Sequence, residues 1–482
     1  MKRYPLLEEI YTPLTAPQCF ELFKDRPFSF FLDSGMDPGK LGRYSFMGND
    51  PFLVLQSRGE EISLSHRNGE EKSIPGNPFD VVNELLELYS LDAPPAGIPL
   101  VGGAVGYFSY DLCHFIERLP STAVDDLNLP ECYLAFYDTV VAFDHLTGKT
   151  YLVATGFPEL EEEKRKHRAE EKLEEMKTKL LNNPWGPNAE ELLTTATVRQ
   201  DIVLKSNFTR EEYLKAVATV REYICAGDIF QVNLSQRFEA DLPVSPYELY
   251  RQLRKINPAP FANYFNFDGV SVVGASPERF LRVSEDWVQT RPVKGTRPRG
   301  KSAAEDEALA QELLSSIKDR AENVMIVDLE RNDLGRVCRY GTVKVTELAI
   351  LETYPTVFHL TSTVEGRLRP GKNRIGLLQA TFPGGSITGA PKVRAMEIID
   401  ELEPTRRSIY TGSLGYLSFS REMDLNIVIR TFIIKGGRAY FQVGGGIVYD
   451  SEPEAEYEET LDKARALIQA LNLSTQVTVE AR

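Results

Sequence analysis

The grouping of strand-length apolar runs is the sequence feature that most constrains this fold. In residues 1–156, short apolar runs such as 52–56 and 133–144 follow one another between Gly, Pro, Asn and Asp, a pattern typical of antiparallel strands joined by turns. After residue 207, further strands come in groups and do not alternate singly with helices. We therefore predict an α+β fold, with a large antiparallel two-sheet β-sandwich core and helices packed outside.

Three helices are predicted in the second half of the chain. Thr209 with Glu212 forms a capping-box pattern, Ser302 with Glu305 forms another, and the last helix starts near Pro453. Strands are expected at residues 270–274, 288–293, 342–351, 411–418, 426–434 and 439–444.

Length and composition indicate how the chain is organised. At 482 residues it exceeds what one compact core usually holds, which suggests two domains or one unusually large two-layer domain. Charged residues dominate 158–181, where we expect a solvated helix, and residues 182–189 contain two prolines and a glycine and are the predicted linker. We predict a sheet-rich N-terminal region over 1–185 and a catalytic region over 205–475.

Charge and cysteine usage exclude several classes of protein. The formal net charge of −15 argues against a general nucleic-acid binder, which needs a basic surface. No run of about 18 apolar residues would span a membrane, and residues 1–9 lack the apolar segment of a secretory signal. Five scattered cysteines indicate buried thiols in a reducing cytoplasm, and neither disulfides nor a zinc site are expected.

Two pairs of acidic residues are spaced for joint action. Asp319 and Glu322 are three residues apart in one predicted helix, as are Glu456 and Glu459 in another, so each pair shares a helical face. If the two helices met, the four carboxylates could hold Mg²⁺. On spacing alone, solvated helix faces are the commoner explanation.

A basic stretch and a separate carboxyl group are further candidates. Residues 291–301 contain five basic residues and no acidic one, which suits a small anion as well as a solvated turn. Within it, Lys294 lies at a strand end, where burial could free its amine as a nucleophile. Glu278 follows an apolar strand and is either a desolvated general acid or, more commonly for such a residue taken alone, an ion-pair partner of Arg279 or another neighbour.

His359 and the glycine-rich stretches give weaker signals. His359 lies in an apolar, strand-like context, where a satisfied core histidine is commoner than a site residue. Residues 384–392 and 102–106 lack the spacing of phosphate-binding and dinucleotide-binding loops. They are tight turns or places where the backbone approaches a ligand, and we expect no nucleotide cofactor.

Together these segments resemble the chorismate-utilising enzymes, namely component I of anthranilate synthase and of aminodeoxychorismate synthase. The resemblance covers nearly the whole chain. In the second region it is carried by ICAGDIFQVNLSQRF (224–238), GASPERF (274–280), PVKGTRPRG (292–300), AENVMIVDLERNDLGR (321–336), PGGSITGAPKVRAMEI (383–398), YTGSLGY (410–416), NIVIRT (426–431) and GGGIVYDSEPEAEYEETLDKA (444–464). In the first region FLDSG (31–35), RYSF (43–46) and GGAVGYFSYD (102–111) also match.

The resemblance implies roles for these residues. Glu322 and Glu459 would approach one Mg²⁺, with Asp319 and Glu456 close behind, and Glu278 would protonate the departing ring hydroxyl of chorismate. The pocket for the two substrate carboxylates would comprise Gly295, Thr296, Tyr410, Arg430, Gly444, Gly445, Gly446 and Lys463. His359 matches a histidine associated with the later steps of the anthranilate branch and is included among the substrate-binding residues.

Lys294 decides between the two branches. The resemblance associates Lys at this position with aminodeoxychorismate synthases and Ala with anthranilate synthases, so we predict that Lys294 attacks chorismate covalently. The product would be 4-amino-4-deoxychorismate, a precursor of 4-aminobenzoate and folate. Ammonia would come from a separate glutaminase subunit, because the chain shows no Cys–His glutaminase arrangement. The alternatives are anthranilate synthase component I and a catalytically idle ligand-binding homologue.

The first region is also expected to contain an effector pocket. Relatives carry a tryptophan site near the positions of Asp33–Ser34 and of residues 257–260. Here Asp33 stands where inhibited relatives tend to have Glu, so feedback inhibition is not expected.

Overall fold

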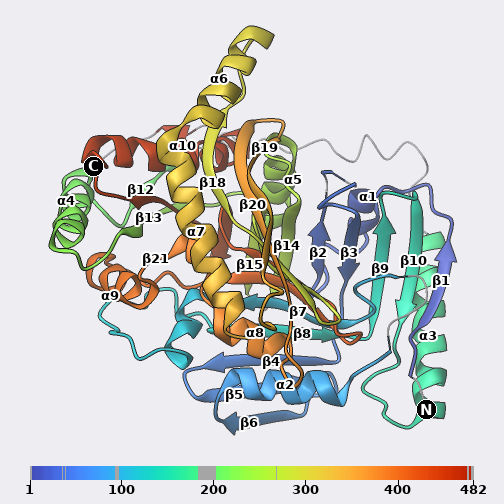
Figure 1. Ribbon diagram of the computed structural model, residues 1–482. Coiled ribbons are helices and arrows are strands. Elements are labelled where there is room, and N and C mark those ends of the chain that lie inside the picture. Colours follow the sequence, from blue (N-terminus) through green and yellow to red (C-terminus); the bar gives the residue numbers. More distant parts are fainter. Residues whose placement is uncertain are drawn as a thin grey trace.

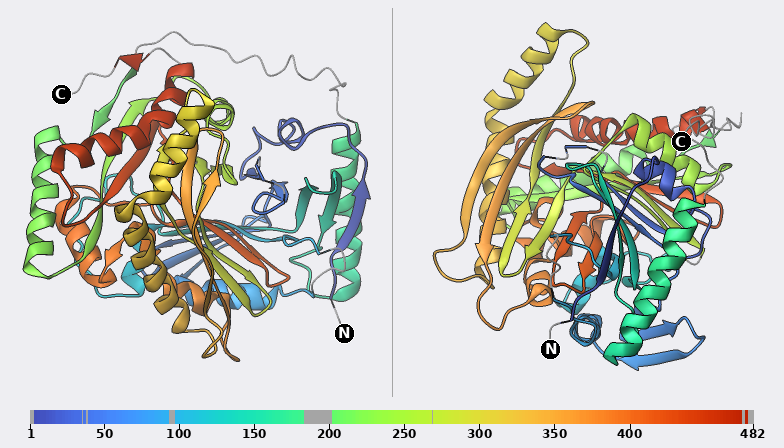
Figure 2. Two further views of the ribbon diagram at one scale, coloured as in Figure 1. Left: turned by 45° about the horizontal axis from the view of Figure 1, so that its top comes forward. Right: turned by 90° about the vertical axis from the view of Figure 1, so that its right-hand side faces the viewer.

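Two large antiparallel sheets form the core of the protein (Figure 1). The computed structural model describes residues 3–34, 36–37, 39–92, 97–182, 202–267, 269–474 and 477–478. Within these ranges each sheet has 12 strands, and helices pack around them (Figures 1 and 2). The predicted α+β fold with a two-sheet core is confirmed. The predicted linker over 182–189 lies outside the described residues apart from Asn182.

The strands of the first sheet come from both ends of the chain. In spatial order they are β1 (Leu6–Ile10), β10 (Lys149–Ala154), β9 (Thr139–Asp144), β3 (Tyr44–Gly48), β2 (Phe30–Asp33), β14 (Phe261–Phe267), β15 (Val270–Ser276), β24 (Thr431–Lys435), β25 (Arg438–Ile447), β13 (Gln231–Asp241) and β12 (Lys205–Ser206), with β21 (Gly389–Ala390) paired to β13.

The strands of the second sheet likewise come from both halves of the chain. Its order is β18 (Val293–Pro298), β20 (Val357–Arg367), β17 (Trp287–Arg291), β16 (Arg279–Ser284), β23 (Met423–Ile427), β22 (Ser413–Ser418), β7 (Gly103–Phe108), β8 (Cys132–Tyr137), β4 (Leu53–Arg58), β5 (Glu61–His66) and β6 (Glu71–Pro75), with β19 (Lys344–Thr353) paired to β20. A separate short parallel pair joins β11 (Ile202–Val203) to β26 (Val477–Thr478).

Strands from the two predicted regions are direct neighbours. β2 pairs with β14 in the first sheet, and β7 pairs with β22 in the second. The division into two regions stays a prediction, but both sheets are continuous across it.

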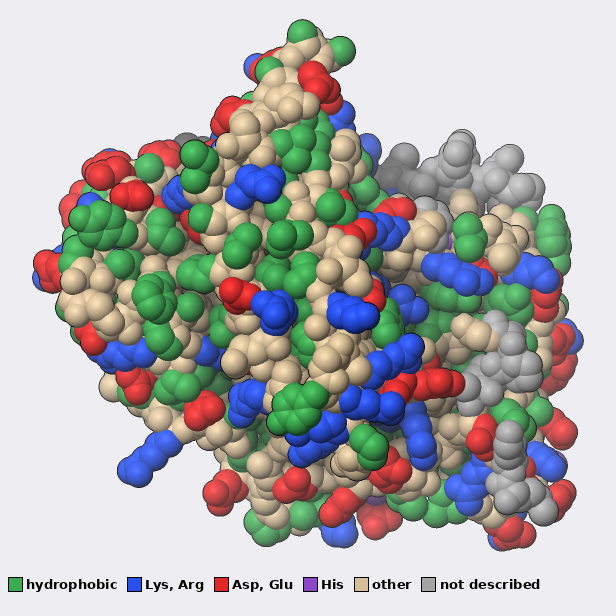
Figure 3. All heavy atoms as spheres, viewed as in Figure 1, with side chains coloured by type: hydrophobic (Ala, Val, Ile, Leu, Met, Phe, Trp, Pro, Cys, Tyr) green, Lys and Arg blue, Asp and Glu red, His purple; other side chains and the backbone are tan. Residues whose placement is uncertain are grey.

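The helices are α1 (Ala16–Phe20), α2 (Pro78–Leu88), α3 (Glu162–Leu181), α4 (Arg210–Ala226), α5 (Pro246–Ile256), α6 (Ala303–Ser315), α7 (Ile317–Gly335), α8 (Arg374–Thr381), α9 (Lys392–Leu402) and α10 (Pro453–Ser474). The predicted capping box at Thr209 and Glu212 starts α4. Helix α10 packs against β25, α4 and α5, and α7 packs against β18, β19 and β20. Helix α6 projects from the body of the molecule (Figures 1 and 3).

Alternation along the first sheet separates two hydrophobic clusters. Phe30 belongs to a cluster that includes Leu425 of the second sheet, whereas the next residue, Phe31, belongs to one that includes Ala464 of α10. Val272 and Val273 of β15 divide in the same way. Because neighbouring strand residues point to opposite faces, this sheet is covered on one side by the second sheet and on the other by helices.

One predicted strand, 426–434, is wrong as a single element. β23 ends at Ile427 in the second sheet and β24 begins at Thr431 in the first. Between them Arg430 has a φ of 51°, a left-handed conformation that is uncommon for residues other than glycine and often marks a functional site. An apolar run can therefore cross from one sheet to the other without a break in its hydrophobicity.

The thiols also depart in part from expectation. Cys19, Cys113, Cys132 and Cys338 are buried, but Cys225 is exposed. Within the described ranges, no helix combines the length and apolarity that crossing a membrane requires.

Candidate active site

The predicted site residues converge where the ends of β18 and β25 meet α7 and α10. Lys294 lies on β18 and Gly444–Gly446 on β25. Glu322 lies on α7, and Glu459 lies on α10. The nucleophile candidate thus comes from one sheet and the glycine segment from the other.

Lys294 is surrounded by charged side chains. Its Nζ lies 3.6 Å from the position that a Cβ on Gly446 would occupy. Burial lowers the pKa of Lys294, while the carboxylate of Glu322 opposes that shift and the nearby Lys463 ammonium adds to it. A lowered pKa increases the fraction of neutral amine, which is the nucleophilic form.

Glu278 lies in the turn between β15 and β16. Only 4% of it is exposed, and the Ser386 hydroxyl donates a hydrogen bond of 2.6 Å to its Oε1. Burial raises the pKa of Glu278 to about 7, against the opposing effects of Ser386 and Lys294. A carboxyl group with this pKa can hold and deliver a proton near neutral pH.

The alternative role of Glu278, an ion pair with Arg279, is not what the structure shows. Arg279 instead forms a bidentate pair with Asp424, with both N–O distances at 2.9 Å. The guanidinium of Arg279 is thus engaged by Asp424 and not by Glu278.

Three of the four predicted metal ligands lie near one another, whereas Asp319 is engaged elsewhere. Glu456 Oε2 and Glu459 Oε1 lie 3.1 and 3.6 Å from the Cβ position of Gly445. Burial raises the pKa of Glu322, and the carboxylate of Glu459 raises it further. Asp319, by contrast, accepts a hydrogen bond of 3.1 Å from Arg297.

These carboxylates fit a divalent cation in their chemistry. Glu456 Oε1 accepts a hydrogen bond from Ser451, but its Oε2 is buried without a hydrogen-bond partner among the described residues. Glu459 is paired with Lys463 at 2.7 Å. Within the described ranges no group of three or more His, Cys, Asp and Glu side chains is already arranged around an ion site. The unpartnered oxygen and the carboxylate donor set nevertheless suit Mg²⁺, which Glu322, Glu456 and Glu459 would hold.

Glycines make room at two of the predicted positions. A Cβ on Gly446 would lie 2.1 Å from Gln231 Nε2, and Gly295 has a φ of 85°. Lys463 donates a hydrogen bond of 2.8 Å to the carbonyl oxygen of Gly444. A side chain at position 446 would collide with Gln231, and one at position 295 would strain the backbone, so both positions favour glycine.

His359 is buried and electrically neutral. Its Nδ1 lies 2.8 Å from the Thr296 hydroxyl, and its Nε2 has no hydrogen-bond partner among the described residues. Burial and the nearby Arg430 lower the pKa of His359 to about 3. One ring nitrogen of this buried histidine is therefore unsatisfied within the described ranges, and its role as a substrate-binding residue stays a prediction.

Arg430 and Tyr410 are both buried among charged or aromatic neighbours. Burial lowers the pKa of Arg430 to about 10, so the guanidinium remains charged at neutral pH and can bind a carboxylate. Tyr410 lies beside Arg407, whose guanidinium is 5.8 Å from the Tyr410 ring centre. Arg407 is itself fixed by a buried ion pair of 2.7 Å with Glu403.

Three residues of this site were not predicted from the sequence. Gln231 lies against Gly446, Ser386 contacts Glu278, and Glu330 contacts the turn that carries Ser386. All three stand inside the quoted motifs, but nothing in their spacing distinguishes them from their neighbours. Their contacts depend on segments far apart in the chain.

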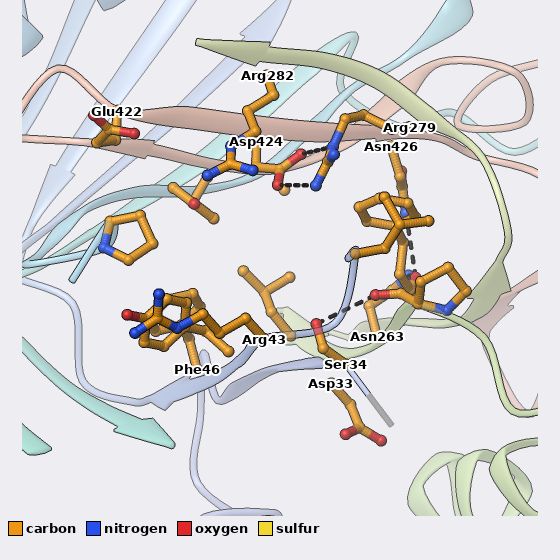
Figure 4. A pocket seen from close by; sticks show the side chains of 18 of the residues that line it. Asp33, Ser34, Arg43, Phe46, Asn263, Arg279, Arg282, Glu422, Asp424 and Asn426 are labelled. Carbon is orange, nitrogen blue, oxygen red and sulfur yellow. Dashed lines mark hydrogen bonds and ion pairs between the residues drawn. The ribbon is translucent and has the colours of Figure 1, made fainter. Parts of the chain in front are cut away.

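A separate cavity of about 450 Å³ lies at the expected effector pocket (Figure 4). Ser34, Pro260, Asn263, Arg282 and Asp424 are among the residues that line it. The Asp33 carboxylate points away from the open space (Figure 4) and accepts hydrogen bonds from Tyr250 at 2.8 Å and Arg254 at 2.5 Å. The position of the predicted pocket therefore contains a cavity, and its ligand stays a prediction.

Comparisons with known proteins agree on one family. Residues 44–469 match the family model described as chorismate binding enzyme. Anthranilate synthase component 1 of Acetivibrio thermocellus is 40% identical over 474 residues, covering 98% of this chain and 96% of that protein. Aminodeoxychorismate synthase component 1 of Bacillus subtilis is 39% identical over 446 residues, covering 92% of each.

A solved structure gives the same result. The crystal structure of anthranilate synthase component I from Streptococcus pneumoniae TIGR4 has 33% sequence identity and a TM-score of 0.77, covering 94% of this chain and 97% of that one.

Proposed function

This chain belongs to the chorismate-binding enzyme family, and from that premise we propose that it makes 4-amino-4-deoxychorismate from chorismate and ammonia. The observation that carries the proposal is the buried amine of Lys294, which has the carboxyl groups of Glu278 and Glu322 as charged neighbours. An alanine at this position would offer no nucleophile.

In the first step, the neutral Lys294 amine forms a bond to C2 of the chorismate ring. The ring double bonds shift, the bond between C4 and its hydroxyl breaks, and Glu278 donates the proton that makes the leaving group water. Ammonia then forms a bond to C4, the double bonds shift back, and the C2–nitrogen bond breaks to release Lys294. The Glu278 carboxylate recovers the proton that ammonia loses. Two displacements thus replace one difficult substitution.

The remaining residues bind and orient the substrate. Arg430 and the Gly444–Gly446 segment would receive its carboxylates, and Lys463 adds positive charge beside them. A Mg²⁺ ion held by Glu322, Glu456 and Glu459 would supply a further positive charge next to the ring carboxylate.

We also propose that ammonia comes from a partner subunit. The relatives are named as component 1 of their enzymes, which implies a second component. A glutamine amidotransferase subunit is the partner that would release ammonia from glutamine.

Identification of the product tests the proposal. Purified protein is incubated with chorismate, Mg²⁺ and an ammonium salt, and the products are separated and identified by mass spectrometry. We expect 4-amino-4-deoxychorismate, with the enolpyruvyl group retained. The appearance of anthranilate without any added lyase would contradict this product, and a lack of chorismate consumption would indicate an idle homologue.

Lys294→Ala isolates the covalent step. We expect kcat to fall by on the order of 100-fold or more, because the variant lacks the attacking amine. Without ammonia, the wild-type protein should carry a covalent adduct with the mass of chorismate less water, and the variant should not. Lys301→Ala, an exposed residue of the same basic stretch, is the matched control. Unchanged turnover in Lys294→Ala would refute the covalent route.

Anthranilate synthase activity is the second candidate. It is favoured by the similarity to anthranilate synthase components and by the unpartnered Nε2 of the buried His359, which could handle a proton in a later elimination. The same product assay separates it from the first candidate.

A further inference from the structure

Helix α7 carries a second buried carboxyl group eight residues beyond Glu322. Glu330 is 2% exposed, and its Oε1 accepts a hydrogen bond of 3.1 Å from the backbone N–H of Gly385. Its Oε2 has no hydrogen-bond partner among the described residues. Burial of a carboxyl group destabilises a protein unless the group is hydrogen-bonded or paired with a charge, so the contacts of Glu330 are informative.

The Gly385 contact leads directly to the proposed general acid. Gly385 opens a short 3₁₀ turn, Gly385–Ile387, and the hydroxyl of Ser386 in this turn donates to Glu278 at 2.6 Å. Glu330, Gly385, Ser386 and Glu278 thus form one continuous chain of contacts, which joins α7 to the turn between β15 and β16.

We propose that Glu330 is a positioning residue for the reaction: by accepting the Gly385 N–H, it fixes the turn so that Ser386 points its hydroxyl at Glu278. This inference rests on the acid role of Glu278 proposed above. Glu330 itself contacts no reacting atom and acts through the turn.

An ion pair lies beside this chain of contacts. Asp333, one helical turn beyond Glu330, forms an ion pair of 2.5 Å with Lys392 of α9. The groups that face Glu330 are Asp333, Lys392 and Glu278, and those that face Glu278 are Lys294 of β18, Arg430 between β23 and β24, and Glu330. Lys392 forms its ion pair with Asp333, and the hydrogen bond that Glu330 accepts comes from the backbone of the turn.

The sign of the expected pH effect follows from the Ser386 contact. A donated hydrogen bond favours the carboxylate and lowers the pKa of Glu278. Loss of that contact therefore raises the pKa, and Glu278 stays protonated to higher pH. Since the acid must be protonated to act, the alkaline limb of the kcat profile should move upward.

The test compares Glu330→Ala, Glu330→Met, Glu330→Gln and Ser386→Ala in the full chain. Chorismate consumption is the readout. We expect Glu330→Ala, Glu330→Met and Ser386→Ala each to lower kcat by about 10-fold, as the loss of one positioned hydrogen bond predicts. The alkaline limb of the kcat profile should rise by about half a pH unit or more. KM should stay within about twofold of the wild-type value. Glu330→Gln keeps an oxygen acceptor for Gly385 and should retain most of the activity. The double variant Glu330→Met with Ser386→Ala should be no slower than either single variant.

Asp328→Ala, on the exposed face of the same helix, controls for general damage to α7. The proposal is overturned if the effects of the two single variants multiply, if the alkaline limb does not move, or if Gln is as harmful as Met. Glu330→Met keeps the buried volume should Glu330→Ala not fold. Anthranilate as the wild-type product would refute the product proposed above and leave this comparison valid, because the readout is consumption of chorismate.

Discussion

At the scale of single residues, the site combines one amine and one carboxyl group that burial drives toward their neutral forms. Burial lowers the pKa of Lys294 and raises that of Glu278. A neutral nucleophile and a protonated acid are the forms that the first displacement needs. Desolvation therefore prepares both reagents before the substrate binds.

The raised pKa of Glu278 makes the free energy of unfolding depend on pH, because the folded protein favours the protonated carboxyl group. Its pKa is about 7 in the folded protein against an ordinary value of 4.5, so its contribution is fully present below about pH 4.5 and is lost as the pH rises through 7. Glu278→Gln resembles the protonated form, and we expect it to be more stable than wild type at pH 8 by about 3 kcal/mol but not at pH 4.5.

Urea unfolding at the two pH values measures this difference. Glu222→Gln, an exposed position on α4, is the control and should show none. If Glu278→Gln and wild type were equally stable at pH 8, the charged Glu278 carboxylate would not destabilise the folded protein, and the prediction would be wrong. The variant should also lose activity, because the glutamine amide cannot donate the proton that makes the leaving group water.

The site could be predicted from sequence only as far as residue chemistry allows. Lys294 and the acidic pairs drew attention because amines and carboxylates are reactive side chains, but spacing alone favoured solvated helix faces for the acids. Their site roles were predicted from the resemblance to the family. Ser386 and Glu330 gave no such signal, although Glu330 is also a carboxyl group, because the role proposed for each rests on one hydrogen bond. Such contacts join segments that are 55 and 108 residues apart, and no local pattern encodes them.

At the scale of secondary-structure elements, helix starts were predicted best. The Thr209 side chain accepts a hydrogen bond from the Glu212 backbone at the first turn of α4, and both residues belong to the local pattern. The strand predicted at 426–434 failed because hydrophobicity alone does not show that Arg430 turns the chain from one sheet into the other. Local signals thus fix where a helix begins, while sheet membership depends on distant partners.

The cap of α4 provides an element-scale prediction. Thr209→Ala removes the acceptor for the Glu212 N–H, and we expect the free energy of unfolding to fall by about 1 kcal/mol. Thr209→Ser keeps the hydroxyl and should restore most of that loss. Thermal or urea unfolding measures both. A loss as large in the Ser variant as in the Ala variant would show that the methyl group, and not the cap, matters.

At the scale of the whole molecule, the two predicted regions share both sheets. β2 of the first region pairs with β14 of the second, and β7 pairs with β22. Separating the regions would expose strand edges and apolar faces that each sheet normally buries.

We therefore expect residues 1–181 and 202–482, expressed separately, not to fold alone. Each fragment should lack a cooperative thermal transition and the near-ultraviolet circular dichroism of packed aromatic residues. The full chain, cut once between the two segments after folding, is the control and should keep both signals, since the contacts between the fragments are already formed. A cooperative transition in either separate fragment would show that the region is an independent domain.

Lys294 is anchored in one sheet and Gly446 in the other, so their spacing is set by how the two sheets rest on each other. An error of about 1 Å in the placement of reacting groups can cost about 100-fold in rate. Core substitutions between the sheets, far from any ligand, can then retune the reaction without changing a single reactive side chain. Substitutions in the hydrophobic interior are therefore, besides substitutions in the site itself, a way for substrate and product preferences to change during evolution.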